Sequence, residues 1–367
     1  MIADFRLKVA AMKRKLIATL CLLNMLPLLA QELQIQSFDN NGQLVFNEIE
    51  NATNYSVKQA VAPYGPWTNF TGEAAALNSI SPSGSGMITS TVPPTGSACF
   101  YRVEALEGMP APAGMVRIPG GTNSGIDPES GVYSLTVSTF YMDKYLVTKE
   151  KWDVVYNWAI TNGYSFDRAG QSKGVNHPVH SQNWYDCVKW CNARSEKEGR
   201  PTVYHVNGNV YRTGQANNVT QTAVAGYRLP TDTEWEYAGR GGLSGKRFPW
   251  GDTITHNQAN YNSYEAYKNF DISTTRGYHP TYATGGLPYT SPVGSFAPNG
   301  YGLYDMTGNL HEWCFDWYPN YEGLYRICRT GSWATHAIVC RVGCRYMYAP
   351  YPGDYYIGFR TVLSPAE

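Results

Sequence analysis

The stretch that decides the fold reads Asn299-Gly300-Tyr301-Gly302-Leu303-Tyr304-Asp305-Met306-Thr307-Gly308-Asn309-Leu310-His311-Glu312-Trp313. Its glycines and asparagines interrupt any helix or long strand, so we expect an ordered loop whose turns the glycines set. The rings of Tyr301, Tyr304 and Trp313 favour a loop that lies on a core. Asp305 and Glu312 supply carboxylates with main-chain carbonyls between them, and hard cations such as calcium prefer such oxygen atoms. The alternative is a buried structural loop with two solvated acids.

Six further motifs occur in order along the chain: Met115-Val116-Arg117-Ile118-Pro119-Gly120-Gly121, Tyr145-Leu146-Val147-Thr148, Tyr227-Arg228-Leu229-Pro230-Thr231-Asp232-Thr233-Glu234-Trp235-Glu236-Tyr237-Ala238, Phe248-Pro249-Trp250-Gly251, Arg329-Thr330-Gly331-Ser332-Trp333 and Gly358-Phe359-Arg360. With the first stretch they resemble the formylglycine-generating enzyme family, also called the sulfatase-modifying-factor domain, from Gly114 to Leu363. The resemblance implies an α+β fold similar to C-type lectins, with few helices, small twisted sheets and long loops held by calcium.

The composition excludes several classes of partner. Lys plus Arg and Asp plus Glu both number 29 in 367 residues, so the formal net charge is zero. Nucleic acids and anionic membrane surfaces recruit basic proteins, so we expect neither as a partner. Charged residues make up 16% of the chain and aromatic residues 14%, with 36 glycines, which is typical of a loop-rich globular protein with an aromatic core.

Residues 1–30 read as a secretory signal peptide. Three basic residues at 13–15 precede an apolar run at 16–29, and Met12 is an alternative start of translation. The run is shorter than the roughly 20 residues that a spanning helix needs, so we do not expect an integral membrane protein. The mature protein is expected to be secreted or periplasmic.

Two domains are expected beyond the signal peptide. In residues 31–107, strand-like alternation at 33–36, 43–46, 55–59 and 99–104 predicts a small all-β sandwich. The order Tyr55-Ser56-Val57, Gly65-Pro66-Trp67 and Phe100-Tyr101-Arg102-Val103 is similar to fibronectin-type-III-like modules. Residues 108–114, rich in alanine and proline, form the predicted linker. Residues 115–365 form the sulfatase-modifying-factor domain.

Cap residues predict three helices in this second domain. Thr148 caps a helix with an apolar stripe of Trp152, Val155 and Ala159 that stops at Gly163. Asn183 caps another, with Asp186 at its third position, a stripe at 184, 187, 188 and 191, and Gly199 as its terminator. Thr231 and Glu234 make a capping box for a third.

The resemblance implies a copper site. In the family, two cysteines after the G-G-S-[WY] motif bind copper(I), which activates oxygen to convert a substrate cysteine into formylglycine; a soft ion prefers soft sulfur. Lining up this sequence from Ser332, the first cysteine position is Thr335 and the second is Cys340, while His336 matches a family histidine. Ser332, His336 and Cys340 are therefore the candidate catalytic residues. Because Thr335 is not a cysteine, the copper pair is incomplete.

Other thiols leave alternatives open. Cys344 follows Cys340 by four residues, and Cys314 and Cys328 lie nearby in sequence, so a rearranged soft-metal site is one alternative. A disulfide or a buried thiol is the other in an exported protein.

The resemblance also implies two calcium positions. Asp305, the carbonyls of Gly308 and Leu310, and Glu312 match the first. Asn260 and the carbonyl of Tyr261 match the start of the second, with Asp271 as a candidate to complete it.

Two functions from different classes follow. The first is a calcium-stabilised binding or structural module that recognises a peptide or glycan in a surface groove around Ser332, Trp333 and His336. The second is an oxygen-dependent copper oxidase that matures sulfatases. The incomplete cysteine pair favours the first. Of the other catalytic motifs, G-x-S-x-G, the P-loop and H-E-x-x-H do not occur in the sequence.

Overall fold

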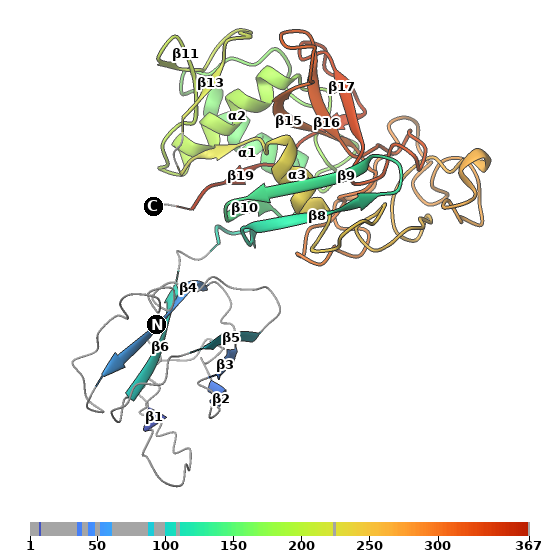
Figure 1. The fold of residues 1–367 in the computed structure, drawn as a ribbon. Coiled ribbons are helices and arrows are strands. Elements are labelled where there is room, and N and C mark those ends of the chain that lie inside the picture. Colours follow the sequence, from blue (N-terminus) through green and yellow to red (C-terminus); the bar gives the residue numbers. More distant parts are fainter. Residues whose placement is uncertain are drawn as a thin grey trace. The chain divides into compact units, whose positions relative to one another are not determined.

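The computed structural model describes residues 111–222 and 225–365, together with six strands that precede them. The chain divides into two compact units, Met1–Pro110 and Ala111–Glu367, and each is described by itself (Figure 1).

The six strands of the first unit form two antiparallel three-stranded sheets. The first sheet has the order β1 (Leu7–Lys8), β6 (Phe100–Glu107), β4 (Ala52–Ala60). The second has the order β2 (Ile35–Phe38), β3 (Gln43–Asn47), β5 (Met87–Thr91). Four of them overlap the four predicted strands. Leu44 and Phe46 are buried and Gln43 is exposed, as alternation predicts. The rest of the predicted signal peptide and residues 108–110 of the predicted linker lie outside the described residues. The fibronectin-like sandwich stays a prediction.

The second unit is a loop-rich α+β fold with four small sheets (Figure 1). The first has the order β14 (Tyr227–Arg228), β19 (Val362–Leu363), β10 (Phe140–Asp143), β7 (Met115–Ile118). The second has the order β17 (Arg345–Tyr348), β16 (Arg326–Arg329), β15 (His311–Trp317), β18 (Ile357–Gly358), in which β15 and β18 are parallel. The others are β12 (Asn209–Val210), β11 (Tyr204–Val206), β13 (Thr220–Gln221), and the hairpin β8 (Gly121–Asp127), β9 (Gly131–Val137).

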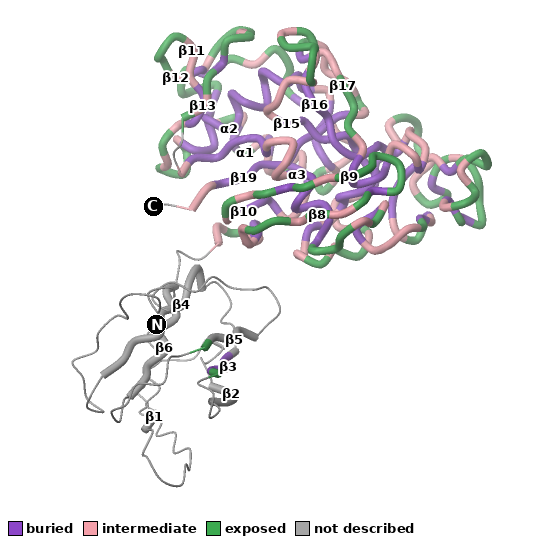
Figure 2. The backbone as a smooth tube through the Cα atoms, viewed as in Figure 1, coloured by how far each residue is buried: buried purple, intermediate pink, exposed green. Residues whose placement is uncertain are grey.

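The three predicted helices are confirmed, each with its predicted cap. Helix α1 (Lys149–Ile160) begins after Thr148, whose side chain accepts from the Lys151 amide. Helix α2 (Trp184–Lys197) begins after Asn183, and α3 (Asp232–Gly239) begins with the complete capping box of Thr231. A short 3-10 helix spans Glu265–Tyr267. Burial in α2 extends beyond the predicted apolar stripe, because every residue from 184 to 195 is buried, charged and polar ones included (Figure 2).

The core is aromatic and lies mainly around α2. Trp152 stacks on Trp190 with ring centroids 5.9 Å apart, and Phe359 meets both rings edge to face. A second buried cluster surrounds Trp235 of α3, and a third gathers Phe248, Ile254, Ala259, Tyr261, Ala337 and Cys340. Within the described residues, no helix is both long enough and apolar enough to span a membrane.

Candidate functional site

The loop at 299–310 is ordered, as predicted, and its own side chains hold it. Strand β15 begins directly after it. The Asn299 side chain accepts from the amides of Tyr301 and Leu303, and its amide group donates to the Ala238 carbonyl at the end of α3 at 2.8 Å. Asn309 adopts φ +64° and exchanges two side-chain hydrogen bonds with the main chain of Ser291. A left-handed φ tolerates asparagine better than most residues, so the motif specifies this turn.

The two carboxylates of the loop lie in different environments. Asp305 accepts one bond at Oδ2 from the Gly294 amide at 2.8 Å, while its buried Oδ1 has no hydrogen-bond partner among the described residues. Burial, aided by repulsion from Glu312, raises the pKa of Asp305 to about 6. Glu312 is also buried, but both of its oxygens accept bonds, from the indole N–H of Trp235 at 2.8 Å and from Arg360 at 2.7 Å. Of the two carboxylates, Asp305 is therefore the one with an unpartnered oxygen among the described residues.

The first predicted calcium set fits a cation in part. The free Oδ1 of Asp305 is a buried anionic ligand, and no hydrogen bond among residues 111–222 and 225–365 reaches the main-chain oxygens of Gly308 or Leu310. These are three of the oxygen ligands that calcium prefers. Glu312 would have to share its carboxylate between the ion and Arg360.

The second predicted calcium set does not fit a metal ion as placed. The Tyr261 carbonyl accepts from Nε2 of His256 at 3.2 Å. Asp271 is fully buried, and its two oxygens accept bonds from Tyr261, Ser263, Tyr264, Ser273 and Arg276. Among the oxygens of this second set, only the side-chain oxygen of Asn260 lacks a partner in the described part of the chain. A single free oxygen is too few for calcium, which takes six to eight.

The predicted copper position holds one thiol. Cys340 is buried, and its Sγ lies 3.7 Å from the hydroxyl of Thr335. That hydroxyl also accepts from the Ser332 amide at 2.7 Å. Burial raises the pKa of the Cys340 thiol to about 12, so the thiol is protonated at neutral pH. The pair at this position is a thiol and a hydroxyl, as the sequence predicts.

Cys314 and Cys328 do not complete the pair. Cys314 and Cys328 pack in two core clusters that do not include Cys340. Cys344 points toward the Arg345 carbonyl, 3.9 Å from its sulfur. All six described cysteines are free thiols, and the described residues contain no group of three or more His, Cys, Asp or Glu side chains that could hold a metal.

His336 and Ser332 lie near Cys340 in sequence, but their side chains make other contacts. Nδ1 of His336 donates to the Asn262 carbonyl at 3.0 Å, and its ring stacks on the exposed Tyr264 with centroids 4.8 Å apart. The hydroxyl of the buried Ser332 accepts from the Ala334 amide. Neither side chain is bonded to Cys340.

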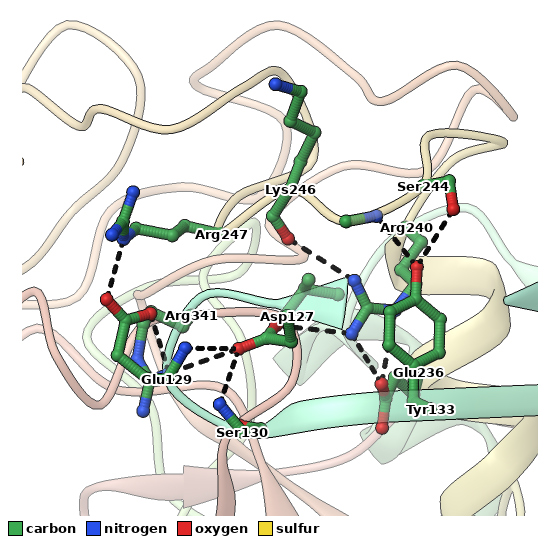
Figure 3. A network of polar contacts seen from close by, with 12 residues as sticks. Asp127, Glu129, Ser130, Tyr133, Glu236, Arg240, Ser244, Lys246, Arg247 and Arg341 are labelled. Atoms are coloured by element: carbon green, nitrogen blue, oxygen red, sulfur yellow. Dashed lines mark hydrogen bonds and ion pairs between the residues drawn. The ribbon is translucent and has the colours of Figure 1, made fainter. Parts of the chain in front are cut away.

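A buried ionic network anchors the segment that carries Cys340 (Figure 3). Arg341 donates to Asp127 at 3.4 Å and to Glu129 at 3.0 Å, and Arg240 at the end of α3 joins Asp127 to Glu236. The network ties the β8–β9 hairpin and α3 to residues 335–344. It therefore connects the segment that carries Cys340 to the core.

Trp333 is not on the surface, which differs from the predicted groove. It is only 1% exposed, because four tyrosines cover it: Tyr278, Tyr289, Tyr355 and Tyr356, with ring centroids 5.2–6.1 Å from the indole. Tyr278 is 42% and Tyr355 37% exposed. We call these four tyrosines over Trp333 the aromatic face. The indole N–H beneath them has no partner in the described structure.

Sequence reasoning missed Arg276, the Tyr278–Tyr289 half of the aromatic face and the pairing of Arg360 with Glu312. Arg360 could have been found, because an arginine inside the Gly358-Phe359-Arg360 motif, between apolar residues, needs an acidic partner when buried. Arg276 and Tyr278 lie in a loop without periodicity and carry no such signal.

Comparisons with known proteins identify the family of this chain. The model of the sulfatase-modifying factor enzyme 1-like domain matches residues 103–365. A formylglycine-generating enzyme of Streptomyces coelicolor is 30% identical over 292 residues, which cover 67% of this chain and 88% of that enzyme. The inactive C-alpha-formylglycine-generating enzyme 2 of Bos taurus is 30% identical over 249 residues, 60% of this chain and 76% of that protein. The solved structure of CarF matches with a TM-score of 0.56 at 25% identity, covering 70% of this chain and 99% of CarF.

Proposed function

The chain belongs to the sulfatase-modifying factor enzyme 1-like domain family, and from that premise we propose that it is a binding module and not a copper oxidase. The family includes both formylglycine-generating enzymes and relatives named as inactive, so membership alone does not decide between the two. The decision rests on the residues around Cys340.

The observation that carries the proposal is the contact between Cys340 and Thr335. A copper(I) site needs soft ligands, and the Thr335 hydroxyl, 3.7 Å from the sulfur, is a hard one. The thiol is also protonated at neutral pH, because burial raises its pKa to about 12. One protonated thiol beside a hydroxyl is a weak copper(I) site, and the oxidase chemistry of the family depends on that ion.

We propose that the binding surface is the aromatic face. Exposed tyrosines offer rigid, amphipathic contact area for a peptide or glycan at a low entropic cost. Tyr278 and Tyr355 are the two exposed members, and their rings rest on the buried indole of Trp333. A ligand that displaces Tyr355 would also supply an acceptor for the free Trp333 N–H.

Calcium has a stabilising role in this proposal. Asp305, with the carbonyls of Gly308 and Leu310 and a share of Glu312, would hold the ion, which supplies positive charge beside two buried carboxylates. Asp305 would bind it in the ionised form. The loop at 299–310 would then keep its C-type-lectin-like course without an uncompensated buried charge.

Copper(I) titration tests the exclusion of oxidase activity. The reduced protein competes for copper(I) with a chelator, beside the variant Cys340→Ala. We expect the chelator to take copper(I) from both proteins to the same extent. We also expect a cysteine-containing sulfatase peptide to stay unchanged when it is incubated with the protein in air. One equivalent of tight binding that the Cys340→Ala variant lacks would overturn the proposal.

A ligand screen tests the binding role. The protein is probed with glycan and peptide arrays, and each hit is measured again with Tyr278→Ala and Tyr355→Ala. We expect at least a tenfold loss of affinity in both variants. The matched control is Tyr321→Ala, which removes a similarly exposed tyrosine that packs on Tyr318 and Tyr325. Hits that bind all variants equally would place the ligand elsewhere.

Export is the last part of the proposal. The basic residues at 13–15 and the apolar run at 16–29 support a secreted or periplasmic protein. Amino-terminal sequencing of the mature protein tests it, since cleavage after Ala30 is expected. A mature chain that keeps residues 16–29 would contradict it.

A further inference from the structure

One guanidinium nitrogen lies at the centre of the loop at 263–277. Nη1 of Arg276 has four oxygen neighbours: the Ser263 hydroxyl at 2.9 Å, the Ser273 carbonyl at 3.1 Å, the Asp271 carbonyl at 3.2 Å and Oδ1 of Asp271 at 3.4 Å. Asp271 is fully buried, whereas the Arg276 side chain is 35% exposed. The arginine therefore reaches in from the surface and closes an oxygen-lined position.

The oxygen set is one that a hard cation would use. Two main-chain carbonyls, one hydroxyl and one carboxylate are hard ligands. A guanidinium carries several N–H donors and no acceptor, so it can donate hydrogen bonds to the same oxygens. The loop is also held by backbone bonds, with the amides of Ser263 and Gly277 each donating to the carbonyl of the other at 2.8 Å.

We propose that Arg276 is a tethered cation that takes the place of a metal ion beside Asp271, the acid expected to complete the second calcium position. The carboxylate of Asp271, the acid at that position, accepts a hydrogen bond from Arg276. The Tyr261 carbonyl already accepts one from His256. The loop at 260–277 consequently folds without a bound metal. Any calcium dependence of this protein then comes from the position at Asp305.

Charge-reduced variants separate this proposal from an ordinary surface ion pair. All measurements use the full chain with Asp305→Asn, which removes the acid of the first calcium position. Arg276→Ala then opens the oxygen-lined position. Arg276→Lys keeps a positive charge there, and serves if the alanine variant does not fold. The matched control is Lys268→Ala, since Lys268 and Arg276 both pair with Glu265 but Lys268 does not touch Asp271.

Two readouts are taken: the melting temperature in EDTA and in calcium, and terbium luminescence excited through tyrosine. We expect Arg276→Ala to lower the melting temperature in EDTA by about 2–6 °C. Calcium should recover at least half of that loss, and terbium should give a signal that Asp271→Asn removes. Lys268→Ala should change neither readout. Arg276→Lys should keep most of the stability and give no terbium signal.

Three results would overturn the proposal. A terbium signal that depends on Asp271 while Arg276 is intact would mean that the position binds metal despite the arginine. An unchanged melting temperature for Arg276→Ala in EDTA would mean that the guanidinium does not hold the loop. A loss that calcium fails to recover would make Arg276 an ordinary ion-pair partner. Copper(I) binding and ligand binding at the aromatic face are independent of all three.

Discussion

Arg360 and Glu312 meet fork to fork in the core, with Nε–Oε2 and Nη2–Oε1 distances of 2.7 Å. Both side chains are fully buried. Oε2 of Glu312 also accepts a hydrogen bond from the Trp235 indole N–H. Arg360 donates in addition to the Tyr304 carbonyl at 2.9 Å. This one pair joins strand β15, helix α3, the carboxyl-terminal motif and the loop at 299–310.

Breaking this pair should be costly. Arg360→Met leaves the Glu312 carboxylate buried and without its main partner, so we expect a loss of about 3–5 kcal/mol in the free energy of unfolding. Urea denaturation in EDTA measures it. The control is Arg345→Met, which removes an arginine that is 44% exposed and paired with Asp232; its loss should stay below about 1 kcal/mol. Similar losses in both variants would contradict the special role of the buried pair.

Restoring the missing cysteine should create a copper site. Thr335→Cys puts a second sulfur close to Cys340, because the Thr335 hydroxyl already lies 3.7 Å from its Sγ. We expect one equivalent of copper(I) to bind under reducing conditions and to be lost again in Thr335→Cys/Cys340→Ala. Thr335→Ser is the control, since it keeps a hydroxyl in place. If Thr335→Cys binds no more copper than the control, a ligand other than residue 335 is missing.

Acid should destabilise the fold through His180. Burial, together with the nearby positive charge of His177, lowers the pKa of His180 to about 4, while Asp354 acts in the opposite direction. Because the folded pKa lies below the unfolded value, stability is complete above about pH 6.5 and falls as the pH drops toward 4. The loss attributable to His180 is about 3 kcal/mol. Urea denaturation between pH 4 and 7 should show a flatter profile for His180→Gln than for the natural chain, and parallel profiles would refute the assignment.

The capping box of α3 should have a measurable value. Thr231 accepts from the Glu234 amide at 3.1 Å, and the Glu234 carboxylate accepts from the Thr231 amide at 2.9 Å. Thr231→Ala should cost about 1 kcal/mol of unfolding free energy. Thr136→Ala is the control, because Thr136 is an exposed strand residue whose side-chain hydroxyl bonds to that of Thr122. An equal effect in both would show that the cap contributes nothing.

Local signals account for what the sequence predicted well. The starts of the three helices depend on one side chain and an amide three residues away, so Thr148, Asn183 and Thr231 are readable without the rest of the chain. The course of the loop at 299–310 is equally local, since Asn299 bonds to residues two and four positions later. The substitution at Thr335 is likewise a property of the sequence alone.

The partners of each charged group were decided by packing. Glu312 was predicted as a calcium ligand from its place in the motif, and the structure adds a residue 48 positions away that donates to both of its oxygens. Trp333 was predicted in a groove and is buried, because tyrosines from 278, 289, 355 and 356 converge on it. Periodicity and caps carry no information about contacts between such distant loops.

By itself the sequence determined the family motifs, the helix starts and the absence of the cysteine pair, because each depends on residue identity or on neighbours within one turn. Only the tertiary structure decided which buried oxygens are already bonded and which are free. Among the described residues, Asp305 keeps one oxygen without a partner, whereas both oxygens of Asp271 accept bonds, from Tyr261, Ser263 and Arg276 among others. The physical reason is that burial makes every unpaired charge costly. The groups that donate hydrogen bonds to these buried carboxylates belong to loops that only packing brings beside them.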